Sequence, residues 1–236
     1  MLAGAVVADA VHAEAKSKMP HVRLAHVFGM TEVGAVIVNP PGAAPSKVMA
    51  TGCAPPGVEL RVVDETFADV PREQEGELVI RSPSTFLGYY DRPQITRDSF
   101  TPDAFFRSGD RVRIDRDGFL HVTGRIKDLI KRGGESVSPA EIEEILLKVP
   151  SVADAAVVGL PDARLGERVC ACVVLRAGAA FTLDEVKHAM VSAGLAKYKW
   201  PERLEIVDEM PRTSIGKVHK ERLRESVMRT RAGSSS

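Results

Sequence analysis

The sequence predicts a mixed α/β (α+β) fold in two parts, a β-rich part followed by a small α/β domain. Two observations lead to this prediction. Short alternating segments separated by turn residues fill the chain up to Thr123, whereas helix and strand patterns alternate beyond it. Between them, residues 122–139 combine three glycines with four cations and two acids, a composition suited to a pivot that also handles anionic groups. A charged hairpin with a glycine turn explains that stretch equally well.

The first part, residues 1–123, reads as a small, mostly antiparallel β unit. A loop leads into a helix that closes before Pro20. A strand at 23–28 is followed by a turn at 29–32, and a Pro/Gly-rich loop covers 39–56. The rest of this part is expected to hold strands at 58–63 and 76–81, one or two helical turns at 94–100, and a hairpin of 105–115 and 118–123 around a strong turn signal.

The second part, residues 124–236, alternates helices and strands. Ser138 and Pro139 predict a helix start with a serine cap and proline at the first helical position. Thr182 and Glu185 have the spacing of a capping box and open a second helix. The remaining expectations are strands at 152–160, 168–175 and 203–207, a last helix at 220–228, and a disordered Gly/Ser-rich tail at 232–236.

Composition excludes several classes of protein. Lys plus Arg equals Asp plus Glu at 32 each, so charge gives no sign of a nucleic-acid partner. No apolar run reaches transmembrane length, and the N-terminus lacks the pattern of a signal peptide. The three cysteines are an odd number without metal-ligand spacing. Cys170 and Cys172 share one face of a predicted strand, where we expect packed thiols and therefore a cytoplasmic location.

Three positions carry residue types suited to chemistry, and each has a plain structural alternative. Thr31 and Glu32 could offer a hydroxyl to phosphate and a carboxylate to Mg²⁺, or simply cap a helix. Asp110 could grip a sugar diol or satisfy a turn. Lys217 follows a glycine that permits close backbone approach, and could stabilise developing negative charge or be an ordinary surface lysine.

The order of the motifs is more informative than any one of them. In sequence they are Phe28-Gly-Met-Thr-Glu32, Gly76-Glu-Leu, Gly88-Tyr-Tyr, Phe106-Arg-Ser-Gly-Asp110, Gly124-Arg-Ile-Lys-Asp128 with Gly133-Gly-Glu135, and Pro211-Arg-Thr-Ser-Ile-Gly-Lys217. This ordered set, spread over about residues 2–224, resembles the acyl- and aryl-CoA synthetases of the adenylate-forming superfamily, which also includes luciferases and nonribosomal peptide adenylation domains.

The resemblance implies a two-step reaction that uses ATP, Mg²⁺ and coenzyme A, the last as thiol substrate. A carboxylate forms an acyl-adenylate with ATP, and a thiol then displaces AMP. On matching positions, the catalytic residues are Thr31, Glu32 and Lys217, with Glu32 holding Mg²⁺. The nucleotide-binding residues are Gly4, Ala5, Phe28, Gly29, Met30, Thr31, Asp110, Arg125 and Lys217.

The same resemblance implies a mobile small domain. It would swing about a hinge at Lys127 and present either Lys217 or a glycine loop on the coenzyme A side. That loop comprises Lys131, Arg132, Gly133, Gly134 and Glu135. Two departures from the family pattern are Val6, where a proline is usual, and Phe28, where tyrosine is frequent.

A larger departure is the phosphate loop of the family, which lies upstream of the Phe28 motif and does not occur in this sequence. We therefore expect the C-terminal half of a synthetase, with a truncated large domain at 1–123, and an N-terminal half as covalent or separate partner. Three hypotheses stay open. The chain belongs to a ligase joining a fatty, aryl or alicyclic acid to CoA, to an aryl-acid adenylating enzyme that loads a carrier protein, or to a non-catalytic remnant that binds nucleotide or a partner.

Overall fold

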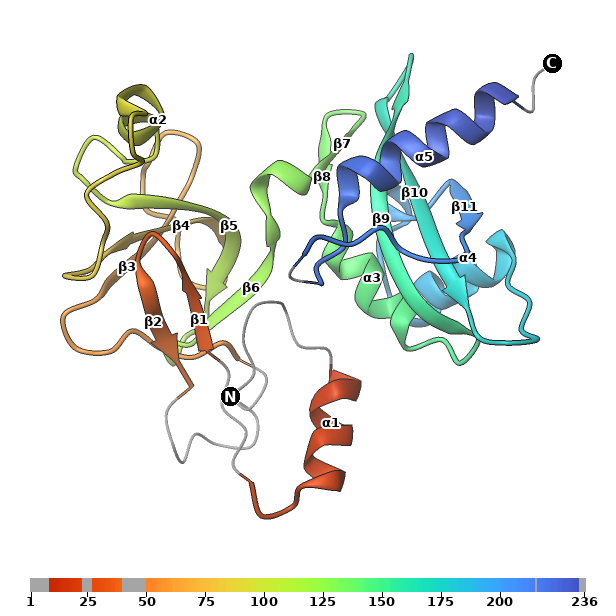
Figure 1. Cartoon of the computed structure of the whole chain (residues 1–236), viewed down its shortest axis with the longest axis horizontal. Helices are drawn as coiled ribbons and strands as arrows, with labels where there is room; N and C mark the ends of the chain where they lie inside the picture. The colour runs from red at the N-terminus through yellow and green to blue at the C-terminus, as the bar shows by residue number, and fades with distance from the viewer. Residues whose placement is uncertain (1–8, 23–26, 40–49, 215, 234–236) are drawn as a thin grey trace. The chain divides into compact units, whose positions relative to one another are not determined.

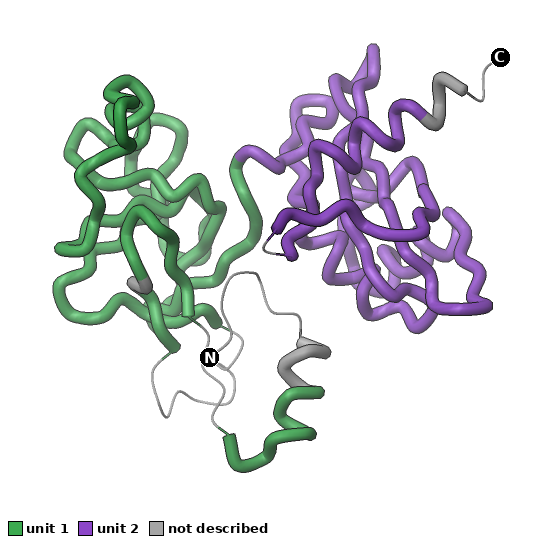
Figure 2. Tube along the Cα trace, in the orientation of Figure 1, with its two compact units in different colours: residues 1–126 green, residues 127–236 purple. Residues whose placement is uncertain are grey.

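The chain divides into two compact units, residues 1–126 and 127–236 (Figure 2). The structure, a computed structural model, describes residues 9–22, 27–39, 50–214 and 216–233. The sequence-based boundary after residue 123 lies close to this division. Each unit has its own buried apolar core.

Unit 1 is β-rich (Figure 1). Its elements are α1 (Asp9–Lys18), β1 (Val27–Met30), β2 (Gly34–Val38), β3 (Glu59–Val63), β4 (Glu75–Arg81), α2 (Pro93–Asp98), β5 (Phe106–Ile114) and β6 (Leu120–Arg125). Strands β3, β4, β5 and β6 pair antiparallel in that order, and β1 and β2 form a separate antiparallel ribbon. The predicted β-rich first part is confirmed.

Alternation of side chains along the strands of unit 1 produces two buried clusters. Val62 and Leu78 belong to the larger cluster, which also takes in Ile37 of β2. Their chain neighbours Val63 and Val79 point to the opposite face and pack with Phe105. Successive residues of a strand face opposite sides, so this split is what a sheet covered on both faces requires.

The prediction for the start of unit 1 needs two corrections. Strand β1 continues through Met30 rather than ending at Phe28, and a second strand, β2, follows at once. The turn is confined to residues 31–33, because Gly34 adopts a φ of +74° that closes the hairpin there. The run of β-branched residues after Gly34 was the available signal for β2.

Unit 2 is a five-stranded sheet with helices. Its elements are β7 (Ile130–Arg132), β8 (Glu135–Val137), α3 (Pro139–Leu147), β9 (Val152–Asp162), β10 (Gly166–Leu175), α4 (Leu183–Ser192), β11 (Arg203–Ile206) and α5 (Lys220–Gly233), and a 3₁₀ turn, Ile126–Asp128, precedes them. Strand β10 is central: β9 pairs along one edge, and β11 and β7 pair with the other. The predicted α/β second part is confirmed.

Helices cover both faces of this sheet. Ile142 of α3 and Met190 of α4 pack with Val157 and Ala171 on one face. Leu223 and Val227 of α5 pack on the other, against a cluster that contains Cys170 and Cys172. Both thiols are fully buried, as predicted. The hydrogen bond between them and their burial raise the pKa of Cys170, so this thiol stays protonated.

The predicted helix ends are right in some details and wrong in others. The capping box of Thr182 and Glu185 is present, and Pro139 stands at the start of α3. Ser138, however, makes no capping hydrogen bond with its side chain, and the residue is buried. Helix α5 runs through Gly233, so residues 232 and 233 are helical and not a disordered tail; residues 234–236 lie outside the described part.

The segment around Gly133 and Gly134 forms a tight β-hairpin. Strands β7 and β8 pair from Ile130 opposite Val137 to Arg132 opposite Glu135. The two residues between them, Gly133 and Gly134, have φ of +59° and +89°. Positive φ at both central positions defines the type I′ turn that matches strand twist, and glycine adopts it without strain.

Candidate active site

Thr31 and Glu32 are presented by the turn between β1 and β2. The amide of Val33 donates to the carbonyl of Met30 at 3.2 Å, and Gly34 follows in the left-handed region. The chain thus turns over residues 31–33 and enters β2 through the left-handed Gly34. Thr31 and Glu32 occupy the two central positions of this turn; Thr31 is exposed and Glu32 half-buried.

The carboxylate of Glu32 is held by a residue to which the motif analysis gave no role. The hydroxyl of Tyr89 donates to Glu32 Oε1 at 2.9 Å. The amide of Phe86 donates to the Glu32 carbonyl at 2.7 Å, and the Tyr89 ring packs edge-on against Phe86 with centroids 4.8 Å apart. Burial, and then the bond to Glu32, raise the pKa of Tyr89. One carboxylate oxygen of Glu32 is therefore committed to a fixed neighbour.

The other predicted nucleotide-binding residues near this turn lie on β1 or outside the described chain. Phe28 and Met30 are half-buried and pack against the larger core cluster of unit 1. Gly29, between them, is exposed. Gly4 and Ala5 lie outside the described residues, and stacking of Phe28 on an adenine stays a prediction.

Asp110 is placed by an irregularity in β5. Between β4 and β5 the register shifts so that Val79 is opposite Arg107 but Glu77 is opposite Arg111. Gly109, inside this bulge, has a φ of +68°, which a non-glycine residue adopts only under strain. Bulges commonly re-aim one side chain near functional sites. Here the bulge precedes Asp110, which is 5% exposed.

Arg125 is the partner that the structure assigns to Asp110. The two residues are opposite each other in the pairing of β5 with β6, and Arg125 Nη1 lies 2.9 Å from Asp110 Oδ1. Asp110 makes further contacts and is nearly enclosed, whereas about half of the Arg125 side chain is exposed. The sequence prediction named both residues, and the structure brings them together.

The opposite face of β5 is a row of ion pairs. Arg107 and Arg111 pair with Glu77 and Glu75 of β4, both at 2.9 Å, and Arg113 pairs at 2.8 Å with Glu73, which precedes β4. Each of these three arginines is thus paired with an acid on or next to β4. Arg125 differs, since its pair is with the buried Asp110.

In unit 2, Lys217 lies in a braced loop. Arg212 and Val218 form an isolated β-bridge, and Thr213 N donates to the Lys217 carbonyl while Lys217 N donates to Thr213 Oγ1. Arg212 also bonds the Gly216 carbonyl and pairs with Asp154. Hydrogen bonds thus hold the backbone at Thr213, Gly216 and Lys217, and the side chain of Lys217 is exposed.

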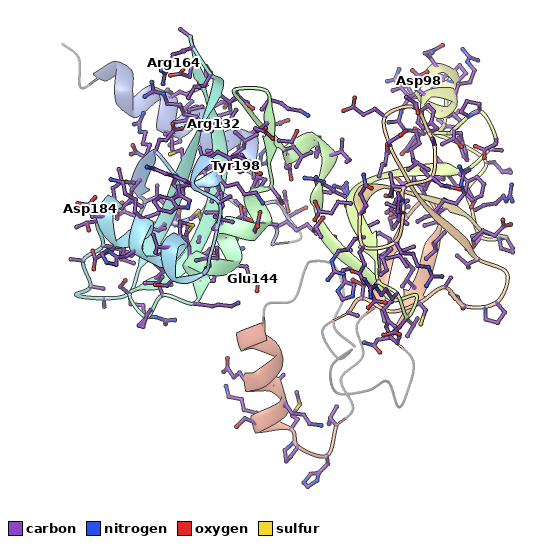
Figure 3. The ribbon with its side chains drawn as sticks, turned by 180° about the vertical axis from the view of Figure 1, so that it is seen from behind. Asp98, Arg132, Glu144, Arg164, Asp184 and Tyr198 are labelled. Carbon is purple, nitrogen blue, oxygen red and sulfur yellow. The ribbon has the colours of Figure 1, made fainter. Side chains whose placement is uncertain are left out.

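The predicted coenzyme A-side loop is the β7–β8 hairpin, and its cations are partly engaged. Arg132, labelled in Figure 3, donates to Glu202 at 2.7 Å, and this bond raises its pKa. Lys131 Nζ donates to Ser136 Oγ at 2.9 Å. Gly133 N donates to the Leu165 carbonyl. The predicted hinge residue Lys127 lies in the 3₁₀ turn at the division between the units and is exposed.

A magnesium ion fits these residues only if substrate oxygens complete its coordination. Within the described ranges, no group of three or more His, Cys, Asp or Glu could hold a metal ion. Glu32 offers one carboxylate, and Mg²⁺ is usually bound by one or two carboxylates plus substrate phosphates.

In the part of the chain that the structure describes, no helix is long and apolar enough to cross a membrane.

Two family models match the chain. The model described as AMP-binding enzyme matches residues 1–90, and the model described as AMP-binding enzyme C-terminal domain matches residues 141–217. The chain belongs to the AMP-binding enzyme family. The predicted likeness to adenylate-forming enzymes is thereby confirmed.

Relatives from this family agree with that assignment. The chain is 40% identical to the medium-chain fatty-acid–CoA ligase of Escherichia coli (strain K12) over 210 residues, which are 88% of this chain and 37% of that protein. It is 46% identical to the 2,3-dihydroxybenzoate-AMP ligase of Bacillus subtilis (strain 168) over 169 residues, 72% of this chain and 31% of that protein. The chain therefore spans about a third of the length of these relatives.

A solved family structure also matches. The ATP-bound structure of MatB from Rhodopseudomonas palustris superposes with a TM-score of 0.88 at 37% identity, covering 95% of this chain and 44% of that one. The mixed α/β fold class is confirmed by this match.

The motif comparison did not identify the residues that hold the predicted site residues in place. Tyr89 was inside a quoted motif, yet its contact with Glu32 joins positions 57 apart. Glu167 and Glu202 of unit 2 contact the β7–β8 hairpin in the same indirect way. The local signal for Glu167 was an acid directly after a glycine, Gly166-Glu167.

Proposed function

We propose that this chain supplies the C-terminal portion of a carboxylic acid:CoA ligase that acts through an acyl-adenylate and then a thioester. The observation that carries the proposal is the exposed Lys217 on a fixed loop, in a unit separate from the one that holds Glu32 and the Asp110–Arg125 pair. Family membership and 40% identity to a fatty-acid–CoA ligase support it. A small-molecule carboxylic acid, ATP and CoA are the proposed substrates.

In the first step, a carboxylate oxygen attacks the α-phosphorus of ATP and the bond to pyrophosphate breaks. Two anions must meet, and the transition state spreads negative charge over phosphate oxygens, so positioned cations and hydroxyl groups are needed. Thr31 would donate to the α-phosphate, and the Lys217 ammonium would approach both the phosphate and the carboxylate. Asp110 would accept from the ribose hydroxyls, with Arg125 setting its direction.

In the second step, a thiol sulfur attacks the acyl carbon, AMP leaves with the bonding electrons, and the thiol loses its proton. We propose that unit 2 turns about Lys127 between the steps, so that Lys217 withdraws and the β7–β8 hairpin is presented. Division of the chain into two units at Ile126 and Lys127 supports a hinge at this position.

Glu32 is the residue that would hold Mg²⁺. A bound magnesium ion would neutralise phosphate charge and orient the leaving pyrophosphate. The hydrogen bond from Tyr89 takes one oxygen of the Glu32 carboxylate and so restricts its rotation. Glu32 is thereby held in one orientation before any ligand binds.

A second candidate function is loading of an aryl acid onto a carrier protein. It is favoured by the 46% identity to a 2,3-dihydroxybenzoate-AMP ligase. The first step is the same, and only the thiol differs. For either function we propose an N-terminal portion as covalent or separate partner, and a cytoplasmic location, in keeping with three free cysteines.

The test is thioester formation by a fusion. The part of the E. coli ligase that precedes the matched region is joined to this chain and assayed with ATP, a panel of fatty, aryl and alicyclic acids, and either CoA or a carrier protein. We expect CoA thioesters. Thioester on the carrier protein alone would favour the second function, and a folded fusion that makes neither would contradict both.

A further inference from the structure

The β7–β8 hairpin has little main-chain pairing to the rest of unit 2. Each of its strands has three residues. Its pairing with β10 is limited to Arg132 opposite Gly166, with one further bond from Gly133 N to the Leu165 carbonyl at 2.7 Å. Short ladders of this kind open readily. Side chains must therefore contribute to holding the hairpin in one position.

Glu167 is the first such side chain. Its Oε2 accepts the Lys131 backbone N–H at 2.8 Å, at the start of the hairpin. Its Oε1 lies 3.4 Å from the guanidinium of Arg224 on α5, and the side chain is 22% exposed. The carboxylate lies directly over Gly159: a Cβ added there would come within 2.6 Å of Oε1. Glycine at 159 thus provides the space that this carboxylate needs.

Glu202 is the second. Its Oε1 accepts from Arg132 Nη2 at 2.7 Å, and its Oε2 accepts from Val169 N at 3.3 Å. The Glu202 backbone N–H also donates to the Val169 carbonyl. This residue therefore joins the hairpin to β10 through a charge-assisted hydrogen bond, which is stronger than a neutral one.

We propose that Glu167 and Glu202, here called the glutamate clamp, are positioning residues that fix the β7–β8 hairpin for the thioester-forming step. The clamp holds β7 at two consecutive residues, by the main chain of Lys131 and the side chain of Arg132. That the hairpin serves this step rests on the proposed function. That the clamp holds it rests on the contacts alone.

Glu167 has a second consequence. Through Arg224 it joins the hairpin to α5, which begins at Lys220, directly after the Lys217 loop. Lys220 itself pairs with Glu143 of α3 at 2.7 Å. The segment for adenylation and the hairpin for thioester formation are thus tied to one sheet and are carried together when unit 2 turns. Small errors in placing reacting groups reduce rates strongly.

The clamp is tested first in the chain itself, by amide hydrogen exchange. Glu167→Ala and Glu202→Ala should raise exchange of the Lys131 and Gly133 amides by about tenfold, because the Lys131 amide or the Arg132 guanidinium loses its acceptor and the hairpin opens more often. Glu205→Ala is the matched control: its side chain is 22% exposed and pairs with Arg203, away from the hairpin. Exchange in the hairpin that stays within about twofold of the control in both clamp variants would overturn the proposal.

The second measurement uses the fusion and separates the two half-reactions. Glu167→Ala should slow thioester formation from supplied acyl-adenylate and CoA by about tenfold or more, while pyrophosphate exchange stays within about twofold. Glu167→Gln should recover part of the rate, because its amide oxygen still accepts from Lys131. If the glutamine variant recovers no rate, or if both half-reactions are lost equally, Glu167 only stabilises the fold of unit 2 and does not position the hairpin for thioester formation.

The two measurements fail in different ways. Faster hairpin exchange with an unchanged thioester step means that the clamp exists but the hairpin does not serve the proposed reaction. Unchanged hairpin exchange rejects the clamp, whatever the fusion catalyses.

Discussion

The carboxylate of Glu32 is set in place by Tyr89, 57 residues further along the chain. The Tyr89 hydroxyl and the Phe86 amide both donate to Glu32, and these two bonds hold the turn that carries it. The same principle holds for Asp110, whose direction depends on Arg125. In both cases an acid of the proposed site is held by a hydrogen bond from another side chain before any ligand binds.

Tyr89→Phe should destabilise unit 1 by about 0.5–1 kcal/mol, the usual net value of a partly exposed hydrogen bond. Packing of the ring on Phe86 is retained, so the loss reports the hydroxyl alone. Urea denaturation followed by circular dichroism measures it. Tyr90→Phe is the control, since Tyr90 is 98% exposed. Equal effects of the two changes would contradict the role given to Tyr89.

The stabilisation by Tyr89 has a defined pH dependence. Burial and the Glu32 carboxylate favour the neutral hydroxyl, so the pKa of Tyr89 is higher in the folded chain than in the unfolded one. The contribution is therefore complete below the unfolded pKa of about 10 and is lost as pH rises through the folded pKa. Measured between about pH 8 and pH 11, the stability difference between the parent and Tyr89→Phe should shrink only above about pH 10. A difference that grows over this range would contradict the assignment.

At the scale of elements, the bulge in β5 is what places Asp110 at the proposed site. With the bulge at Gly109, Asp110 lies opposite Arg125 of β6 while Arg107 and Arg111 still form ion pairs with acids of β4. A residue with a side chain at 109 would meet no atom within 4 Å, so glycine is required there by φ and not by space.

Gly109→Ala should therefore cost about 1 kcal/mol, the strain of a left-handed conformation. It should also weaken nucleotide binding by the fusion, because Asp110 shifts with the bulge. Gly194→Ala is the matched control, with a φ of +69° and equally open space at the end of α4. Isothermal titration with ATP and thermal melts measure both effects. Loss of nucleotide affinity in the control as well would mean that stability alone is responsible.

Local patterns predicted most elements of the fold. Period-two alternation and turn residues located β3 to β6, and the capping box of Thr182 located α4, because these signals act within a few residues. The local Ser-Pro pattern predicts a side-chain cap at Ser138 that is not formed; the residue is buried, and its surroundings are set by tertiary packing, which that pattern does not contain. The end of α5 was missed because Leu223 and Val227 anchor the helix to the sheet, and a Gly/Ser-rich tail gives no sign of this.

The candidate site was predicted in part for the same reason. Asp110 and Arg125 lie in recognisable motifs, and their pairing follows from the predicted hairpin once its register is known. Tyr89, Glu167 and Glu202 contact residues that are distant in sequence. Their roles depend on how strands and loops pack, which the spacing of nearby residues does not predict.

At the scale of the molecule, the chain is two separately packed bodies joined at Ile126 and Lys127. Lys127→Pro should restrict this junction, because proline fixes φ near −65° and also limits the residue before it. In the fusion we expect the two half-reactions to be reduced unequally while the melting temperatures of both units hold. Equal reduction with both units folded would count against Lys127 as the hinge.

Unit 2 alone is expected to fold, because both faces of its sheet are covered by its own helices. Residues 125–233, expressed alone, should melt cooperatively.

The 236-residue chain by itself should show no ATP–pyrophosphate exchange with any acid of the panel, because it has no counterpart of the family's phosphate loop. Robust exchange by the purified chain would contradict this.

The most direct test of the whole account is the effect of Lys217→Ala on the two half-reactions of the fusion. The ammonium on the braced loop is proposed to act only while unit 2 faces the nucleotide. Pyrophosphate exchange should therefore fall by about 10²–10³, the worth of one well-placed charged donor, while supplied acyl-adenylate is still converted to thioester at close to the parent rate. A Lys217→Ala variant that loses both half-reactions equally, or that retains pyrophosphate exchange, would contradict the proposal.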